Sequence, residues 1–353
     1  MPGAKIPWWR PDRHAARRPY LRRRAEVLAA IRAWFAGEGF AEVETPALAA
    51  SPGIEPHLDA FATDILGARG GRGTLYLHTS PEYAMKKLLV AGETRIYQLA
   101  RCYRNRERGP THHPEFTMLE WYRANAGYRE IMRDCEGLLR ACAGPQGVYR
   151  WKGMACDPRL PWEYLSVEEA FRRHADIDLL ATAPDPARPD AARLAAEARR
   201  IGLTAAPGDA WDDVFFRVFL ERIEPKLGHP APTILHDYPV SMAALSRVKP
   251  DDPRLAERFE LYVAGLELAN AFGELTDAAE QRRRFLADQQ TRRARVGEAY
   301  PIDEDFLAAL AHGMPEAAGI ALGLDRLVML AAGAEDIAQV LWAPVPDAAG
   351  DET

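Results

Sequence analysis

Two extended segments joined by an arginine- and histidine-rich loop constrain the fold of this chain most strongly. The segments are Ile96–Tyr103 and Glu115–Tyr122, and the polar stretch between them predicts an antiparallel pair with a long connection. Because alternate side chains of a strand share a face, one face of the second strand presents a carboxylate together with aromatic rings. The residues on that face are Phe116, Met118, Glu120 and Tyr122.

The remaining periodic segments predict further helices and strands. Apolar residues at helical spacing predict an amphipathic helix from Tyr20 that ends before Gly37 and Gly39, and Ser80-Pro81-Glu82 predicts the start of a helix that runs to about Val90. We expect another helix over Tyr128–Cys142, an extended edge or interface segment over Phe40–Pro46, a hairpin over Glu260–Glu274 that turns at Ala264-Gly265, and a strand over Gly319–Leu322 that leads into a helix over Leu324–Ala332.

These elements favour an α+β fold, a mostly antiparallel sheet flanked by helices. We expect one main domain over residues 20–345, an N-terminal arm over 1–19 and a tail over 346–353. The Ala-, Pro- and Asp-rich stretch of about 171–232 predicts a helical insertion within that domain.

Composition narrows the function classes. Residues 1–24 lack the apolar core of a signal peptide, and Asp325 and Arg326 interrupt the most apolar later stretch, so we expect neither secretion nor a membrane span. The four cysteines form no C-x-x-C pair, which indicates reduced, cytoplasmic thiols. A net charge of -6 argues against electrostatic binding of nucleic acid over the whole protein surface, whereas a local group of arginines suits a small polyanion such as ATP. They are Arg101, Arg104, Arg106 and Arg108.

Three segments occur in an order that resembles the three motifs of class II aminoacyl-tRNA synthetases: Phe40–Pro46, Arg101–Tyr122 and Gly319–Arg326. The stretches His112–Tyr122 and Glu267–Ala278 resemble the lysine branch, in particular the freestanding lysyl-tRNA synthetase paralogues that modify elongation factor P. The resemblance covers roughly residues 20–345. It implies the class II catalytic fold, use of ATP and Mg²⁺, and a homodimer with the first motif at the subunit interface.

Adenylation needs positive charge on both the transferring and the departing phosphates, which arginine supplies bidentately. By resemblance, the catalytic Arg104 contacts the α-phosphate and the substrate carboxylate, and Arg326 the γ-phosphate. Arg326 also lies in the first turn of a predicted helix, where an anion is favoured. The resemblance places Phe116 against adenine and His112 near the phosphates. The family has Glu two residues after the motif arginine; Arg106 stands there in this chain, which leaves Glu107 as the expected ATP contact.

By the same resemblance, Glu260 and Glu267 are the carboxylates that hold Mg²⁺ against the phosphates. Glu267 has the opposite strand parity to Asn270, Phe272 and Glu274, so the hairpin requires a bulge between them. A pocket that binds lysine needs acidic side chains next to the two amines and apolar side chains around the methylene groups. The positions that match lysine contacts are Glu82, Glu120, Tyr122, Asn270, Phe272 and Glu274.

We therefore expect ATP-dependent activation of lysine and its transfer to a lysine side chain of elongation factor P. Ala321 stands where lysyl-tRNA synthetases typically carry glycine, and its methyl group would disfavour an α-amino group, which favours (R)-β-lysine. The family core begins within about twenty residues of Met1, so we expect no anticodon-dependent tRNA binding.

Two alternatives stay open: a truncated lysyl-tRNA synthetase that charges tRNA, and a non-catalytic regulatory paralogue. A non-catalytic paralogue does not need intact phosphate-binding and metal-binding residues, yet the residues expected in these roles are all present: Arg104, Glu260, Glu267 and Arg326.

Overall fold

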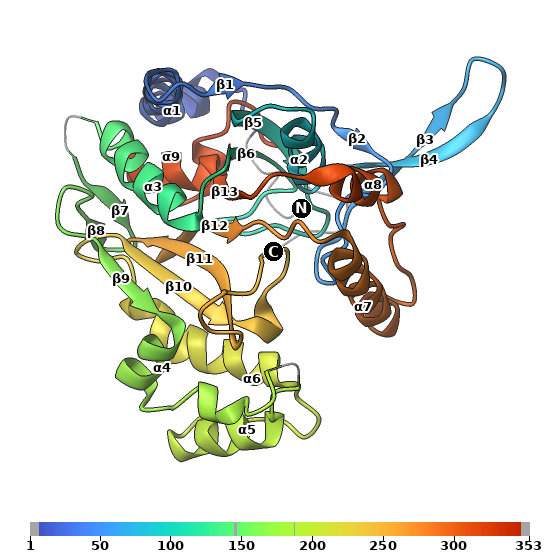
Figure 1. Ribbon diagram of the computed structural model, residues 1–353. Helices are drawn as coiled ribbons and strands as arrows, with labels where there is room; N and C mark the ends of the chain where they lie inside the picture. Colours follow the sequence, from blue (N-terminus) through green and yellow to red (C-terminus); the bar gives the residue numbers. More distant parts are fainter. Residues whose placement is uncertain (1–6, 145–146, 187, 347–353) are drawn as a thin grey trace, which may run out of the picture.

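The computed structural model describes residues 7–144, 147–186 and 188–346, and its centre is an eight-stranded sheet (Figure 1). The strand order is β1-β5-β6-β13-β12-β11-β10-β9. The outermost pairs β1–β5 and β9–β10 are parallel and the pairs between them antiparallel, so the expected mostly antiparallel α+β sheet is confirmed. The strands are β1 (Ala41–Glu42), β5 (Arg95–Tyr103), β6 (Glu115–Ala124), β9 (Glu163–Ser166), β10 (Thr233–Pro239), β11 (Leu255–Val263), β12 (Leu266–Gly273) and β13 (Ala317–Gly323).

One face of this sheet is covered by α1 (Pro11–Gly37), α3 (Tyr128–Cys142) and α9 (Leu324–Ala332), which pack against one another (Figure 1). Their apolar side chains share a core with Leu119 and Trp121 of β6. Burial of these two residues leaves the alternate residues of β6, from Phe116 to Tyr122, for the opposite face, as the strand period predicts.

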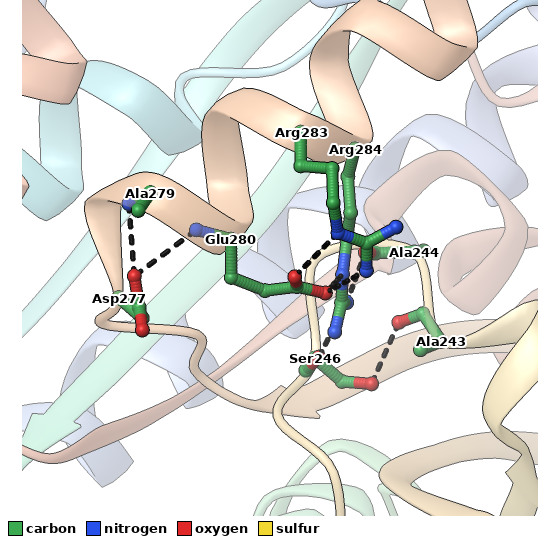
Figure 2. Close-up of polar contacts among 8 residues, drawn as sticks. All are labelled: Ala243, Ala244, Ser246, Asp277, Ala279, Glu280, Arg283 and Arg284. Carbon is green, nitrogen blue, oxygen red and sulfur yellow. Dashed lines mark hydrogen bonds and ion pairs between the residues drawn. The ribbon is translucent and has the colours of Figure 1, made fainter.

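On the other side lie α2 (Glu82–Val90), α7 (Ala278–Val296) and α8 (Glu304–Gly313), which pack around a second apolar cluster. The Asp277 carboxylate caps α7 by accepting hydrogen bonds from the backbone N–H groups of Ala279 and Glu280 (Figure 2). The cap fixes where α7 starts.

A third cluster is built by helices at the β9 end of the sheet (Figure 1). Phe171, Trp211 and Phe215 are buried there together with Tyr262 of β11, so these helices are anchored to the sheet. They are α4 (Val167–Ala175), η1 (Leu180–Thr182), α5 (Ala191–Arg200), α6 (Trp211–Val218), η2 (Phe219–Ile223) and η3 (Glu224–Lys226).

Smaller elements complete the described chain. The hairpin of β3 and β4 projects from the body of the molecule (Figure 1). All four cysteines are buried free thiols, and within the described ranges every helix is too short or too polar to cross a bilayer. The remaining elements are β2 (Leu48–Ala49), β3 (Phe61–Leu66), β4 (Arg72–Leu77), β7 (Tyr149–Trp151), β8 (Met154–Cys156), η4 (Val240–Met242) and η5 (Ile337–Gln339).

Three local predictions differ from the structure. Helix α1 begins at Pro11 rather than Tyr20. The sequence pattern missed this start because the arginine-rich stretch before Tyr20 is mostly exposed and carries no apolar period. Pro81 is the cap of α2 rather than its first residue, although the Ser80 hydroxyl still accepts a hydrogen bond from the Glu82 N–H. Only Ala41 and Glu42 of the 40–46 segment pair in the sheet. Residues 1–6 of the expected arm and 347–353 of the expected tail lie outside the described residues.

Candidate active site

A cavity of about 670 Å³ opens on the sheet face away from α1, α3 and α9. Strands β6, β12 and β13 form its floor, the 104–113 loop one wall, and α7 another. Ten of the fourteen site residues expected from the sequence line it: Glu82, Arg104, Glu107, His112, Phe116, Glu267, Asn270, Phe272, Ala321 and Arg326.

The register of the sheet brings the floor residues together. Ala321 of β13 is paired with Asn270 of β12 on one side and with Glu120 of β6 on the other. Residues directly opposite one another in antiparallel strands share a face, so side chains far apart in the sequence meet in one row.

A bulge in the β11–β12 hairpin turns Glu267 to the cavity. Leu261 is paired with Ala269, but Tyr262 is paired with Glu267, so Leu268 is the extra residue. This confirms the bulge that was predicted because Glu267 and Asn270 are an odd number of residues apart. As a result, Glu267 lines the same cavity as Asn270.

One end of the cavity is rich in arginine. Arg326, at the start of α9, donates from Nη1 to the carbonyl oxygen of Glu267 at 2.9 Å and from Nε to that of Thr111 at 3.2 Å. Its Nη2 lies 2.7 Å from Nε2 of His112. Burial and the Arg326 charge lower the pKa of His112, so the neutral imidazole accepts this hydrogen bond. These contacts fix the guanidinium next to a helix N-terminus, an arrangement that favours an anion.

Arg104 supplies a second cation at this end. Its guanidinium carbon lies 5.2 Å from the centre of the Phe116 ring. Its Nε is buried and has no hydrogen-bond partner among the described residues. Glu107 lines the cavity, whereas Arg106 has a positive φ of 64° and an exposed side chain that lies 3.6 Å from Asp59. The chain therefore turns Glu107, and not Arg106, toward the cavity.

The two expected metal ligands are close but differ in surroundings. Glu260 is 7% exposed, accepts hydrogen bonds from Arg258 Nη2 and the Tyr262 hydroxyl at 2.7 Å each, and lies outside the cavity lining. Burial, and then the charge of Glu260, raises the pKa of Glu267. Two carboxylates that repel each other beside Arg104 and Arg326 fit a hard divalent cation and the oxygens of a phosphate group, since the cation relieves the repulsion.

The opposite end of the cavity is acidic. Glu82 lines it, while the Nζ of Lys86 forms ion pairs with Glu82 and with Glu274 Oε2, the latter at 2.5 Å. Lys86 and Glu274 side chains are 0% and 1% exposed. One lysine thus bridges two of the acids expected to hold an amino-acid ligand, and Glu120 adds a third carboxylate beside them.

Glu120, Tyr122 and Glu274 lie beneath the cavity floor rather than in its lining. The Glu120 carboxylate accepts hydrogen bonds from the Ser80 hydroxyl at 2.6 Å and the Tyr122 hydroxyl at 2.9 Å. Burial, and then the charge of Glu82, raises the pKa of Glu120 to about 8. Two carboxylates and a third acid, Glu120, which ionises near a cation, leave this end able to accept a further cation beside Lys86.

Gly319 is required for this packing. A Cβ atom at Gly319 would lie 2.2 Å from Cδ1 of Tyr122 and 2.7 Å from Oε1 of Glu274, and contacts so short do not occur. The glycine therefore lets the tyrosine and the acid approach the same point of the sheet.

Sequence reasoning missed four polar residues of the site. Arg258 donates to Asn270 Oδ1 at 3.2 Å as well as to Glu260, and its strand parity with Glu260 was a usable signal. Lys86 follows Glu82 by one helical turn, which was a second signal. Glu55 lies in a loop and Asp288 on the side of α7 that lines the cavity, and their distance along the chain from the motifs gave no signal.

Comparison with known proteins gives the family of the chain. The family described as "tRNA synthetases class II (D, K and N)" matches residues 9–345. A protein of Pectobacterium carotovorum subsp. carotovorum named "Elongation factor P--(R)-beta-lysine ligase" is 42% identical over 94% of this chain and 96% of its own length. A protein of Salmonella dublin with the same name is also 42% identical, over the same shares of both chains. The chain therefore belongs to the family of class II tRNA synthetases of the D, K and N group.

Proposed function

We propose that this protein is a ligase that activates (R)-β-lysine with ATP as its adenylate and transfers it to a lysine side chain of elongation factor P. The observation that carries this proposal is one cavity with an arginine pair at one end and a cluster of buried acids at the other. A lysine isomer has one carboxylate and two amines, and it fits such a cavity lengthwise. The names of the Pectobacterium and Salmonella relatives supply the acceptor and the isomer.

The arginines and the acids have separate roles in adenylation. A carboxylate oxygen of the amino acid attacks the α-phosphorus of ATP, and pyrophosphate leaves. Arg104 neutralises the transferring group and Arg326 the departing one, while the Phe116 ring supports the adenine. At the other end, Glu82 and Glu274 orient the amines and Phe272 covers the methylenes.

A bound Mg²⁺ would be held by Glu260 and Glu267 and would neutralise phosphate charge. The two carboxylates are two residue rows apart on neighbouring strands, because Glu260 is paired with Asn270 and Tyr262 with Glu267. Arg258 holds Glu260 in place on its other side.

We further propose that residues 20–345 form the catalytic unit, that two copies associate through the 40–46 segment, and that the enzyme works in the cytoplasm, where ATP and its acceptor are present. The first motif of the family, which this segment resembles, supports the dimer. Sedimentation at micromolar concentration tests it, and a monomer there would contradict it.

Amino-acid-dependent exchange of pyrophosphate into ATP, followed by transfer of labelled lysine to elongation factor P or to lysine tRNA, tests the function. We expect exchange with a lysine isomer and label in the protein acceptor. Absence of exchange would identify a non-catalytic paralogue, and efficient labelling of tRNA would identify a synthetase.

A further inference from the structure

Two carboxylates in the cavity have no task in amino-acid activation. Glu55 precedes β3 and Asp288 belongs to α7, yet both line the cavity that holds Arg104 and Glu82. Oε2 of Glu55 is buried without a hydrogen-bond partner in the described chain. Asp288 likewise forms no hydrogen bond or ion pair with a described residue. Acids enclosed without a donor are costly unless they meet a ligand or a proton.

The cation whose charge acts on Asp288 is hydrogen-bonded to other residues. Arg284, one helical turn earlier, donates from Nε to Glu280 Oε1 at 2.8 Å and from Nη1 to the carbonyl oxygens of Ala244 and Ser246 at 2.8 and 2.7 Å (Figure 2). These bonds fasten α7 to the loop at 244–246, part of which lines the cavity. Arg284 thus fixes the position of Asp288 without forming a hydrogen bond to it.

Oε2 of Glu55 is also held in place without a donor. A Cβ atom at Gly53 would lie 2.5 Å from Oε2 of Glu55, so the carboxylate is packed against the Gly53 backbone. The nearby Thr79 hydroxyl donates elsewhere, to the carbonyl oxygen of Pro52 at 2.7 Å. Burial and then the charge of Glu82 raise the pKa of Glu55, a backbone hydrogen bond and the charge of Arg104 partly oppose this, and the charge of Asp288 adds a smaller upward contribution.

The position of this pair in the cavity indicates which ligand reaches it. Both acids are next to exposed residues of the lining, His57 and Thr291, whereas the side chain of Glu274, an acid assigned to the amino acid, is 1% exposed. A cation that enters from solvent after the amino acid is in place can therefore reach this pair.

We propose that Glu55 and Asp288 bind the ammonium group of the acceptor lysine side chain and take its proton before it attacks the adenylate. The inference rests on the proposed function. The freed amine nitrogen forms a bond to the carbonyl carbon of the adenylate, and the bond from that carbon to the phosphate oxygen breaks. AMP leaves with the electron pair, and the second amine proton passes to the carboxylates or to solvent. The products are an amide, AMP and two protons.

Separate measurement of the two half-reactions tests this role in Glu55→Gln, Asp288→Asn and the double variant. We expect pyrophosphate exchange with (R)-β-lysine to stay within about threefold of the wild type. Single-turnover transfer to elongation factor P should fall in the double variant by about 10²- to 10⁴-fold, the range of a general base. Hydroxylamine is neutral at pH 7 and needs no base, so its reaction with the enzyme-bound adenylate should be unchanged.

The matched control is Asp212→Asn, which removes an exposed acid of the same cavity on α6. Transfer should persist in this variant; an equal loss would mean that only the overall negative potential matters and would overturn the assignment. So would lost pyrophosphate exchange in the Glu55 or Asp288 variants, which would place these acids on the amino acid. A rise in KM for elongation factor P at unchanged kcat would make them docking contacts. If the wild type itself shows no exchange, the proposed function fails instead.

Discussion

Ala321 and Asn270 are paired across the β12–β13 ladder, and both line the cavity. The other neighbour of Ala321 in this row is Glu120, so one methyl group lies in the floor between an amide and a buried carboxylate. We expect Ala321→Gly to shift the ratio of kcat/KM for α-lysine over (R)-β-lysine roughly 10- to 200-fold toward α-lysine, the effect of one methyl group in a tight pocket.

Ala318→Gly is the control for this change. It removes the same methyl group from the same strand, but Ala318 belongs to the core on the opposite face of the sheet. We expect it to leave the isomer ratio unchanged. An identical ratio in Ala321→Gly and the wild type would refute the steric account.

Arg326→Ala should lower lysine-dependent pyrophosphate exchange by at least ~100-fold, because a preorganised charge that contacts the departing phosphates is lost. Arg150→Ala removes an exposed arginine on β7 and should leave exchange unchanged. Equal exchange in Arg326→Ala and the wild type would remove Arg326 from the site.

Glu267→Gln should raise the Mg²⁺ concentration required for half-maximal exchange, since a neutral amide replaces a hard anionic ligand. A magnesium titration compares it with the wild type and with Glu298→Gln, which changes an exposed acid. If the magnesium titration curves of all three proteins coincide, Glu267 is not a ligand.

Glu120 predicts a pH dependence of amino-acid binding. Burial raises its pKa to about 8, so it is largely protonated at neutral pH in the free enzyme. The charges of Lys86 and of a bound substrate amine both favour the ionised form, so binding should release a proton and tighten as pH rises toward about 8, by at most tenfold per pH unit. Calorimetry at pH 7 in buffers of different ionisation enthalpy measures that release. Proton uptake, or equal release in Glu120→Gln, would contradict the assignment.

Much of the fold could be predicted from local pattern. The period of two on β6 separates Leu119 and Trp121, which enter the core, from Phe116 and Glu120 on the site side. The opposite parity of Glu267 and Asn270 required a bulge, and the sheet register contains it at Leu268. These features were accessible because strand geometry acts between residues a few positions apart.

Long-range features of the site could not be read in this way. That Lys86 bridges Glu82 and Glu274 depends on where α2 docks on the sheet, and only the tertiary packing fixes it. Glu55 and Asp288 line one cavity for the same reason, since Arg284 fastens α7 to a loop that no local pattern connects to it. The helical start at Pro11 was missed because exposed arginines carry no apolar period.

The most direct test is mass spectrometry of purified elongation factor P after incubation with this enzyme, ATP, Mg²⁺ and either α-lysine or (R)-β-lysine at equal concentration. We expect one lysine side chain of the acceptor to gain the mass of one lysyl group, and to gain it faster with (R)-β-lysine than with α-lysine. An unmodified acceptor in the presence of active pyrophosphate exchange, or faster modification with α-lysine, would contradict it.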